Sequence, residues 1–520
     1  MANDSSQNQY VQNPQHTLKI PPHLLPSEIS VFGYGVTSKP FVEFINSCGK
    51  VCNIYDDRFE IESSDKNGNI LLPPSAFCAN KSSLEFISPG ILPHHKYFSK
   101  SRNKIGEYDY IWELMAFNNF GLKSIWISGT NGKTTTTQML AFLLESFGGV
   151  SGGNIGTPLT NLALEYAKQA NKYNKQQAST NKVRFEIPIW VLESSSFAMH
   201  YANIATPQIY LLLPLSQDHI SWHNGYENYV ADKLRVLSRM SNSCFVILPK
   251  ELQTHKIVEE YLQRHGGKNT KNCGNTITNG AFFYKDSSDL VAFLGIELES
   301  ICFNEPFLLD SLLALSGAFV AKKMGLLDSC AKSSLSEDFS LDFAISVLNS
   351  FHIGAHRIEE FYEPCKQDDL ESKWLWVDDS KGTNTDATLQ AFKRYKGRCI
   401  YAVLGGDDKG ADIEPIFTLL SNGFCTKNSF VKIFAIGSNE AKILSLAKEY
   451  GIFAKPCGNL KNAIKSIKKE RDIARKKNEK KAKEFIVSFV GLLSPAAASL
   501  DQFSSYKERG ELFKKYALES

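Results

Sequence analysis

One glycine-containing segment limits what this chain can fold into more than any other. Residues 128–135 read Ser-Gly-Thr-Asn-Gly-Lys-Thr-Thr, preceded by the apolar run 125–127 and followed by the helix-like stretch 136–144. A strand, a glycine turn and a helix start direct free backbone N–H groups and the helix dipole at one point, which favours a bound anion. Lys133 can then reach the terminal phosphates of a nucleotide, and the Thr134 hydroxyl can hold its magnesium. The segment predicts a nucleoside triphosphate site in an α/β sheet.

The glycine spacing of this loop differs from the commonest form. That form places its first glycine five residues before the second, where this chain has Ile127, whereas Gly129 and Gly132 are closer together. The alternative is a Gly-Lys-Thr turn that only caps a helix. The adjoining strand and the additional threonines favour the phosphate site.

Chain length and composition indicate several ordinary domains. A chain of 520 residues is too long for one core, and three domains are the natural expectation. No apolar run reaches the roughly twenty residues of a membrane helix, and the first residues lack the basic and apolar regions of a signal peptide. The eleven cysteines are scattered, which is typical of reduced thiols. We therefore expect a cytoplasmic protein without a transmembrane segment.

One segment accounts for the net charge of +3. Residues 461–484 carry eleven Lys or Arg against four Asp or Glu. Ile464 and Ile467 recur there at helical spacing, which predicts a helix with one apolar edge and a solvated charged face. A surface for nucleic acid or an anionic membrane is the alternative, but no aromatic residues are interleaved with the charges. No nucleic-acid partner is expected.

The first part of the chain is predicted to be a flexible arm, residues 1–27, followed by a domain at 28–120. The arm is rich in Asn, Gln, Ser and Pro, and folding is expected to begin near Ile29. Strand-like residues 29–32 enter a glycine turn, and a second strand at 51–55 ends in acidic residues, as in a Rossmann-like unit. Because Ser38 replaces the third glycine of a dinucleotide fingerprint, a nucleotide-sugar site and an NAD site fit equally.

The central domain is predicted at residues 121–354. Apolar runs 189–192 and 208–213 are typical of parallel strands in the same sheet as the phosphate loop. Glu193 follows the first run, where a carboxylate can hold magnesium, and Asp218-His219 follows the second. A strand-end acid and a lone histidine are more often structural. Residues 168–184, rich in Lys, Asn and Gln, are interpreted as a surface insertion.

A third α/β pattern is predicted at residues 355–520. Its candidate strands are 374–377, 400–404, 431–435 and 485–489. The fold class is therefore α/β with three domains: a Rossmann-like N-terminal domain, a central P-loop-type ATPase sheet and a Rossmann-like C-terminal domain.

The order of short motifs along the chain resembles the Mur ligase family. The similar segments are residues 129–135, 153–156, 193–197, 218–219, 231–235, 356–359, 379–384, 405–409 and 493–503. Asp379-Ser380-Lys381 and Leu493-Ser494-Pro495-Ala496 are similar to the member that adds D-glutamate, and relatives that add other amino acids carry different residues there. The Asp-Asn-Pro-Arg signature of the diaminopimelate-adding member is not found.

The resemblance implies an ATP-dependent amide ligase of peptidoglycan precursor synthesis. UDP-N-acetylmuramoyl-L-alanine would take the γ-phosphoryl group on its carboxylate, and the amine of D-glutamate would displace phosphate from this acyl phosphate. ATP and two Mg²⁺ ions are the implied cofactors, and a monomer is expected. Another amide ligase of the same fold, similar to folylpolyglutamate synthetase, is the alternative. Domains are expected to close, because ATP and D-glutamate must meet.

The resemblance also implies roles for particular residues. The catalytic residues would be Lys133, Glu193, His219 and Lys233. ATP would contact Gly129, Thr130, Asn131, Gly132, Lys133, Thr134, Thr135, Arg357 and Asp379. Magnesium would be held by Thr134, Glu193, His219 and Lys233, the lysine as a carbamate, which turns a cation into an anionic oxygen ligand. Substrates would contact Val36, Thr37, Asp57, Arg58, Ser88, Asn154, Lys381, Thr383, Lys409, Ser499, Leu500 and Tyr506.

Two departures from the family pattern concern the nucleotide and D-glutamate. Many relatives carry an Asn-rich helix start that contacts adenine, whereas this chain has leucines and an acid at 308–315. Tyr506 stands where the family often has phenylalanine. The sequence therefore leaves the adenine contact unassigned.

Overall fold

The computed structural model describes residues 11–12, 18–154, 156–177, 187–265, 280–328, 339–363, 374–426, 429–477 and 489–519. The chain divides into two compact units, Met1–Phe351 and His352–Ser520. No helix in these ranges combines the length and apolar character that crossing a membrane requires. The cysteines described form no disulfide. Three six-stranded sheets, each mostly parallel, make up the two units, so the predicted mixed α/β class is confirmed.

The first unit begins with a sheet of order β5-β6-β4-β3-β7-β8. Its strands are β3 (Ile29–Phe32), β4 (Asn53–Tyr55), β5 (Ser63–Ser64), β6 (Ile70–Leu72), β7 (Leu84–Ile87) and β8 (Lys104–Gly106), with helix α1 (Ser38–Ser47) after β3. All neighbours are parallel except β5 and β6. The predicted Rossmann-like start is therefore confirmed, with both predicted strands in place.

The expectation that folding begins near Ile29 is wrong. Leu18, Ile20, Leu24 and Leu25 are buried in the main core of the first unit. Strand β2 (Lys19–Ile20) pairs with β1 (Val11–Gln12), and the hydroxyl of Tyr110 donates to the carbonyl of Leu24 at 2.9 Å. Four apolar residues among polar ones suffice to anchor this part of the predicted arm, because burial of each leucine-sized side chain contributes about 2 kcal/mol. Residues 1–10 and 13–17 lie outside the described ranges.

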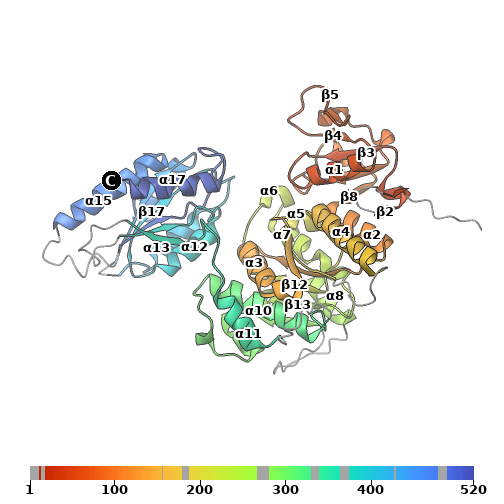
Figure 1. Ribbon diagram of the computed structural model, residues 1–520. Coiled ribbons are helices and arrows are strands. Elements are labelled where there is room, and N and C mark those ends of the chain that lie inside the picture. The colour runs from red at the N-terminus through yellow and green to blue at the C-terminus, as the bar shows by residue number, and fades with distance from the viewer. Residues whose placement is uncertain are drawn as a thin grey trace, which may run out of the picture. The chain divides into compact units, whose positions relative to one another are not determined.

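The second sheet has the order β10-β11-β9-β12-β13-β14 and is parallel throughout. Its strands are β9 (Lys123–Ser128), β10 (Gly149–Gly153), β11 (Ile189–Glu193), β12 (Ile209–Leu212), β13 (Phe245–Pro249) and β14 (Ala281–Tyr284). Both predicted strands, at 189–192 and 208–213, flank the strand of the phosphate loop. Helices α3 (Lys133–Leu143) and α10 (Phe307–Lys323) cover one face, and α4 (Leu159–Gln177) covers the other (Figure 1). Residues 168–177 of the predicted insertion continue α4, and 178–184 lie outside the described ranges.

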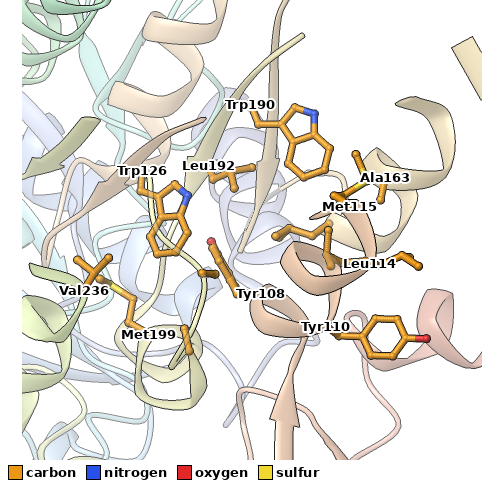
Figure 2. Close-up of a cluster of buried hydrophobic side chains, with 14 of the residues drawn as sticks. Tyr108, Tyr110, Leu114, Met115, Trp126, Ala163, Trp190, Leu192, Met199 and Val236 are labelled. Atoms are coloured by element: carbon orange, nitrogen blue, oxygen red, sulfur yellow. The ribbon is translucent and has the colours of Figure 1, made fainter. Parts of the chain in front are cut away.

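Helix α2 (Glu107–Phe117) joins the cores of these two sheets. The ring of Tyr110 packs edge-on against Phe41 of the first sheet's layer, with centroids 4.9 Å apart. Tyr108 packs in the same way on Trp126 of β9, at 4.6 Å (Figure 2). One continuous cluster of buried side chains therefore extends across both sheets, and the first unit is compact although it holds two sheets.

The second unit holds a sheet of order β15-β16-β20-β17-β18-β19. Its strands are β15 (Glu359–Tyr362), β16 (Leu375–Asp378), β17 (Cys399–Leu404), β18 (Val431–Ile436), β19 (Phe453–Gly458) and β20 (Phe489–Leu493). Only β15, which pairs with β16, is antiparallel. The predicted strands near 375, 400 and 431 are confirmed, whereas most of the one predicted at 485–489 lies outside the described ranges. The antiparallel edge strand and β19 were not predicted, because neither has an apolar run.

Helices α12 (Thr385–Arg394), α13 (Glu414–Ser421), α14 (Glu440–Glu449), α15 (Leu460–Lys477) and α17 (Tyr506–Leu518) complete this unit. Ile464 and Ile467 of α15 are buried against the sheet, which confirms the predicted apolar edge. Lys461, Lys465 and Lys469 face solvent at four-residue spacing. The basic segment therefore has a solvated face over the part of it that is described.

Candidate active site

The phosphate loop adopts a conformation that only glycine allows at two positions. Gly129 has φ of 141° and Gly132 has φ of 78°. A Cβ on Gly129 would lie 2.4 Å from the Cβ of Leu213, so the loop is pressed against the end of β12. Gly132 is the N-cap of α3, and no side chain caps that helix start. The first turn of α3 therefore begins directly at the phosphate loop, where the helix dipole favours an anion.

The side chains of the phosphate loop make contacts within the loop and with the segment after β12. Thr134 and Thr135 are buried in the first turn of α3, and Lys133 donates from Nζ to the carbonyl of Thr130 at 2.6 Å. The hydroxyl of Thr130 accepts the backbone N–H of Ser216 at 2.9 Å. The lysine ammonium is thus folded back over its own loop, at the point where phosphate charge would collect.

One carboxylate oxygen of Glu193 has no hydrogen-bond partner among the described residues. Glu193 ends β11 and is 2% exposed. Asn154 donates from Nδ2 to Oε1 of Glu193 at 3.0 Å, whereas Oε2 is buried and accepts no hydrogen bond from the described residues. A buried carboxylate oxygen with no donor is costly unless a cation faces it. The donor set, with the hydroxyl of Thr134, fits magnesium.

Lys233 is buried behind the phosphate loop. It lies on α7 (Tyr226–Leu234), is 1% exposed, and donates to the carbonyl of Gly129 at 2.9 Å and to Oγ of Ser128 at 3.2 Å. Burial, followed by the nearby charge of Lys133, holds the pKa of the Lys233 amine well below its usual range. A neutral amine is the form that can add CO₂ to become a carbamate.

His219 stands at the start of α6 (Ile220–His223) in a left-handed conformation, with φ of 52°. Its side chain is 42% exposed, lies 3.5 Å from Asp218, and meets the ring of Phe197 edge-on. Phe197 is four residues beyond Glu193. The fold therefore brings the predicted ligands of the first unit to neighbouring segments at the carboxyl ends of β9, β11 and β12.

Tyr229 is a site residue that the sequence reasoning missed. Its hydroxyl lies 2.8 Å from Oγ1 of Thr130, and Nζ of Lys233 lies 4.8 Å from its ring centroid. Tyr229 comes one helical turn before Lys233, so the spacing alone could have placed both on one face of α7. The tyrosine connects the phosphate loop to the helix that carries the buried lysine.

Helix α10 places an acid next to the phosphate loop. A Cβ on Gly132 would lie 2.1 Å from Oδ1 of Asp310, and Asp310 is 5% exposed. The stretch 308–315, where relatives have an Asn-rich start, therefore does reach the loop. In this chain the side chain that reaches the loop is the carboxylate of Asp310.

The predicted contacts of the N-terminal sheet lie around the turn after β3. Asp56, rather than the predicted Asp57, closes this turn: its carboxylate accepts the N–H of Tyr34 and the Nε–H of Arg58, both at 2.7 Å. Hydrogen bonds from Arg58 lower the pKa of Asp56 to about 2. Because this acid is already engaged, it is poorly placed to accept the ribose hydroxyl of a dinucleotide. Val36 is 80% exposed beside it.

A narrow pocket connects this turn to the central sheet. Thr37 and Pro89 line it from the first sheet, and Asn154 and Ser195 line it from the second. Ser88 donates its backbone N–H to the carbonyl of Phe32 and so sits at the same edge. The predicted substrate residues Thr37, Ser88 and Asn154 thus share one region of the first unit.

In the second unit, a buried histidine holds the segment that carries Arg357. His356 and Ile358 both have left-handed backbones, with φ of 65° and 47°. His356 Nδ1 lies 2.7 Å from Asp378 Oδ2, and the carboxylate of Asp379 accepts the N–H of Ile358 at 3.3 Å. Two such backbone conformations cost roughly 1–3 kcal/mol each, so the surrounding hydrogen bonds maintain a strained turn at Arg357.

Burial raises the pKa of Asp379 to about 7, and the hydrogen bond from Ser494 at 2.7 Å opposes this rise. Between the unfolded pKa of 3.8 and about 7, the folded chain keeps a proton that the unfolded chain has lost, so stability falls as pH rises. We expect the Asp379→Asn variant to lack this dependence. In urea unfolding from pH 4.5 to 7, the free energy of unfolding of wild type should fall by up to about 1.4 kcal/mol per pH unit relative to that of the variant. The same pH dependence of the unfolding free energy in wild type and variant would contradict the raised pKa of Asp379.

The predicted D-glutamate residues occupy three loops that follow adjacent strands β16, β20 and β17, except Tyr506, which begins α17. Asp407 and Ala498 form an isolated bridge between two of these loops. Nζ of Lys381 lies 5.3 Å from the ring centroid of Tyr506, and Lys409 has a left-handed backbone with φ of 51°. Ser499 is buried and Leu500 is 65% exposed, whereas Thr383 donates its N–H to the carbonyl of Lys381.

Arg509 is a second residue that the sequence reasoning missed. It is fully buried on α17 and donates to Ser380 Oγ at 3.0 Å, to the Ser380 carbonyl at 2.8 Å and to the Ala497 carbonyl at 3.0 Å. One guanidinium therefore fixes the loops after β16 and β20 relative to each other. A lone Arg in Lys507-Glu508-Arg509-Gly510 gives no sequence signal of burial.

We expect Arg509→Leu to destabilise the second unit by about 3 kcal/mol or more. The variant leaves two buried carbonyls and a hydroxyl without donors, each costing about 1–3 kcal/mol. Urea unfolding followed by tryptophan fluorescence measures this loss through Trp374 and Trp376, which are buried in the same core. The matched control is Arg398→Leu, whose guanidinium carbon lies 6.0 Å from the ring centroid of Tyr395, and it should cost far less.

Three comparisons with known proteins bear on this site. Residues 127–300 match the family model described as the Mur ligase middle domain. A Campylobacter jejuni protein named "UDP-N-acetylmuramoylalanine--D-glutamate ligase" is 39% identical over 488 residues, which cover 94% of this chain and 98% of that protein. A Helicobacter pylori protein of the same name is 39% identical over 491 residues, covering 94% and 99%. This chain belongs to the Mur ligase family.

The fold comparison agrees with this membership. The crystal structure of MurF from Acinetobacter baumannii superimposes on this Mur ligase with a TM-score of 0.52 at 14% identity, covering 95% of this chain and 92% of that one. At that identity the match shows the fold alone. The three-domain α/β architecture predicted from the sequence is therefore confirmed.

Proposed function

We propose that this Mur ligase joins D-glutamate to UDP-N-acetylmuramoyl-L-alanine in an ATP-dependent reaction of peptidoglycan precursor synthesis. The observation that carries the proposal is the 39% identity, over nearly the full length of both chains, to relatives named for this reaction. The phosphate loop follows β9, and Glu193 ends the neighbouring strand β11 with one oxygen that has no partner among the described residues; both support ATP chemistry. The chain acts in the cytoplasm as a monomer.

In the first unit, the ATP phosphates bind at the N-terminus of α3. The backbone of Gly129, Thr130, Asn131, Gly132 and Thr135 surrounds them, and Lys133 neutralises charge as the γ-phosphoryl group moves to the alanyl carboxylate. Thr134 and Glu193 would hold one Mg²⁺, and His219 with carbamylated Lys233 a second. Bound magnesium supplies positive charge to the phosphate oxygens and the acyl phosphate.

The low pKa of Lys233 supports its carbamylation. The neutral amine attacks CO₂ through its lone pair and loses one proton, which gives a carbamate anion near Lys133. This reaction places an anion near the Lys133 ammonium, where the free amine carries no charge. Ser128 and the carbonyl of Gly129, which now contact the amine, orient the group.

The acceptor is selected in the second unit. Lys381 and Lys409 each offer a charge-assisted hydrogen bond to one carboxylate of D-glutamate. Thr383, Ser499, Leu500 and Tyr506 complete that subsite, and Arg357 and Asp379 contact ATP's phosphates and ribose. In the N-terminal sheet, Val36, Thr37, Asp57, Arg58 and Ser88 hold the uridine diphosphate, and Asn154 contacts the muramoyl group.

A phosphate-release assay tests the proposal. UDP-N-acetylmuramoyl-L-alanine and ATP are combined with one amino acid at a time, and we expect release only with D-glutamate. Turnover with L-glutamate or diaminopimelate but not with D-glutamate would refute it. Turnover with a folate and L-glutamate would instead support the folylpolyglutamate synthetase alternative, which the names of the relatives disfavour.

A further inference from the structure

A buried network next to the proposed magnesium site has no role in the reaction described above. Its centre is Asp232, whose carboxylate lies 2.7 Å from Nδ1 of His223 and 2.9 Å from Nδ1 of His200. Nε2 of His223 lies 2.9 Å from Oγ of Ser196. A carboxylate only accepts, so both histidines donate from Nδ1, and His223 in its neutral form accepts the Ser196 hydroxyl through Nε2.

Each member of this network belongs to a segment that carries a proposed ligand. Ser196 begins α5 (Ser196–Tyr201), three residues after Glu193. His223 ends α6, whose N-cap is His219. Asp232 immediately precedes Lys233 on α7. Four side chains therefore tie together the three segments on which the metal site depends.

The network is rigid, because its surroundings leave little freedom. The side chain of His223 is fully buried and that of Asp232 is 12% exposed. The ring of Phe197 lies parallel to that of His223 at 5.6 Å and edge-on to that of His219 at 4.6 Å. Arg235 donates to the carbonyl of His200 at 2.9 Å, which fixes the end of α5.

We propose that Asp232 is a positioning residue for the magnesium site, an inference that rests on the proposed function. Through its two histidine contacts it sets the distances between the segments that carry Glu193, His219 and Lys233. It touches neither substrate nor nucleotide. Residues that orient metal ligands in this indirect way typically change metal affinity about 10- to 100-fold when they are replaced.

The test measures metal binding rather than turnover. Full-length protein is titrated with Mn²⁺ in the presence of a non-hydrolysable ATP analogue, and free Mn²⁺ is followed by electron paramagnetic resonance. Asp232→Asn keeps the side-chain shape but loses the negative charge and one of the two acceptor oxygens that face the histidines, and it should bind Mn²⁺ about 10-fold or more weakly. His200→Gln is the milder second variant, because His200 is partly exposed, and it should weaken binding in the same direction.

Asp109→Asn is the matched control. Asp109 is also a buried carboxylate of the first unit, and it accepts the N–H groups of Asn203, Ile204 and Ala205 just beyond α5. It should lower the melting temperature as Asp232→Asn does, yet leave Mn²⁺ affinity unchanged. Equal losses of Mn²⁺ affinity in both variants would reduce Asp232 to a structural role.

Two further outcomes would overturn the proposal. One is Mn²⁺ affinity within about twofold of wild type in both Asp232→Asn and His200→Gln. The other is wild-type protein that adds no Mn²⁺ binding to that of the free nucleotide analogue. Neither readout requires D-glutamate or UDP-N-acetylmuramoyl-L-alanine, so failure of the proposed substrates would be seen separately, in the phosphate-release assay.

Discussion

We expect Lys133→Ala to abolish phosphoryl transfer, with the single-turnover rate reduced about 10³-fold or more. The ammonium lies over the loop, 2.6 Å from the carbonyl of Thr130, and the nearby amine of Lys233 is buried and has a pKa well below its usual range. Lys233 therefore cannot replace the charge of Lys133. Rapid-quench measurement of the γ-phosphate of labelled ATP, with UDP-N-acetylmuramoyl-L-alanine bound, determines the rate.

Lys123→Ala is the control for this variant. Lys123 starts the same strand, β9, and donates to the carbonyl of Leu326 at 2.6 Å, at the end of the strand opposite to the phosphate loop. Its removal should affect stability more than phosphoryl transfer. Measurable transfer in Lys133→Ala at a rate near that of Lys123→Ala would contradict the role of Lys133.

Replacement of Lys233 by alanine should give a protein that is inactive but can be partly restored. The variant removes the proposed carbamate and leaves a cavity beside Ser128 and Gly129, where a small carboxylate such as acetate can place its oxygens. We expect turnover below about 1% of wild type, as for loss of a group that completes a metal site, with partial recovery as acetate is added.

Lys233→Arg separates this rescue from a general salt effect. Arginine cannot form a carbamate, and its guanidinium fills the space that acetate would take. This variant should stay inactive at every acetate concentration. Full activity of Lys233→Ala without added acid would show that carbamylation has no part in the reaction.

The sequence predicted those parts of the fold that have a strong local pattern. Apolar runs that end in a glycine or an acid, such as Ile125–Ile127 before the phosphate loop and 189–192 before Glu193, became buried parallel strands. Strand β19 is exposed at both ends and contains an exposed proline, so its pairing with β18 is a tertiary effect. The anchoring of Leu18 and Ile20 likewise depends on a surface provided by other elements.

Of the candidate site too, the sequence predicted only the residues that belong to a local pattern. Motif spacing singled out Lys133 and Glu193, because each stands at a fixed offset from a predicted strand, whereas Lys233 was predicted only from the resemblance to the Mur ligase family. Arg509 acts through carbonyls of distant loops, and Asp232 acts through two histidines on other helices. Such contacts exist only once the chain is folded, so a single sequence carries no local signal of them.

Helix α2 limits how this enzyme can be divided or recombined. Its two tyrosines belong to different sheets, and the hydroxyl of Tyr108 also reaches Oγ of Ser194 at 2.9 Å, next to Glu193. A fragment that ended before Glu107 would lack the helix that packs on the first sheet. A fragment that ended after Phe117 would expose the aromatic side chains of α2 that normally pack against the second sheet. The first two sheets therefore share one core, and we expect that a chimera between relatives has to exchange both together.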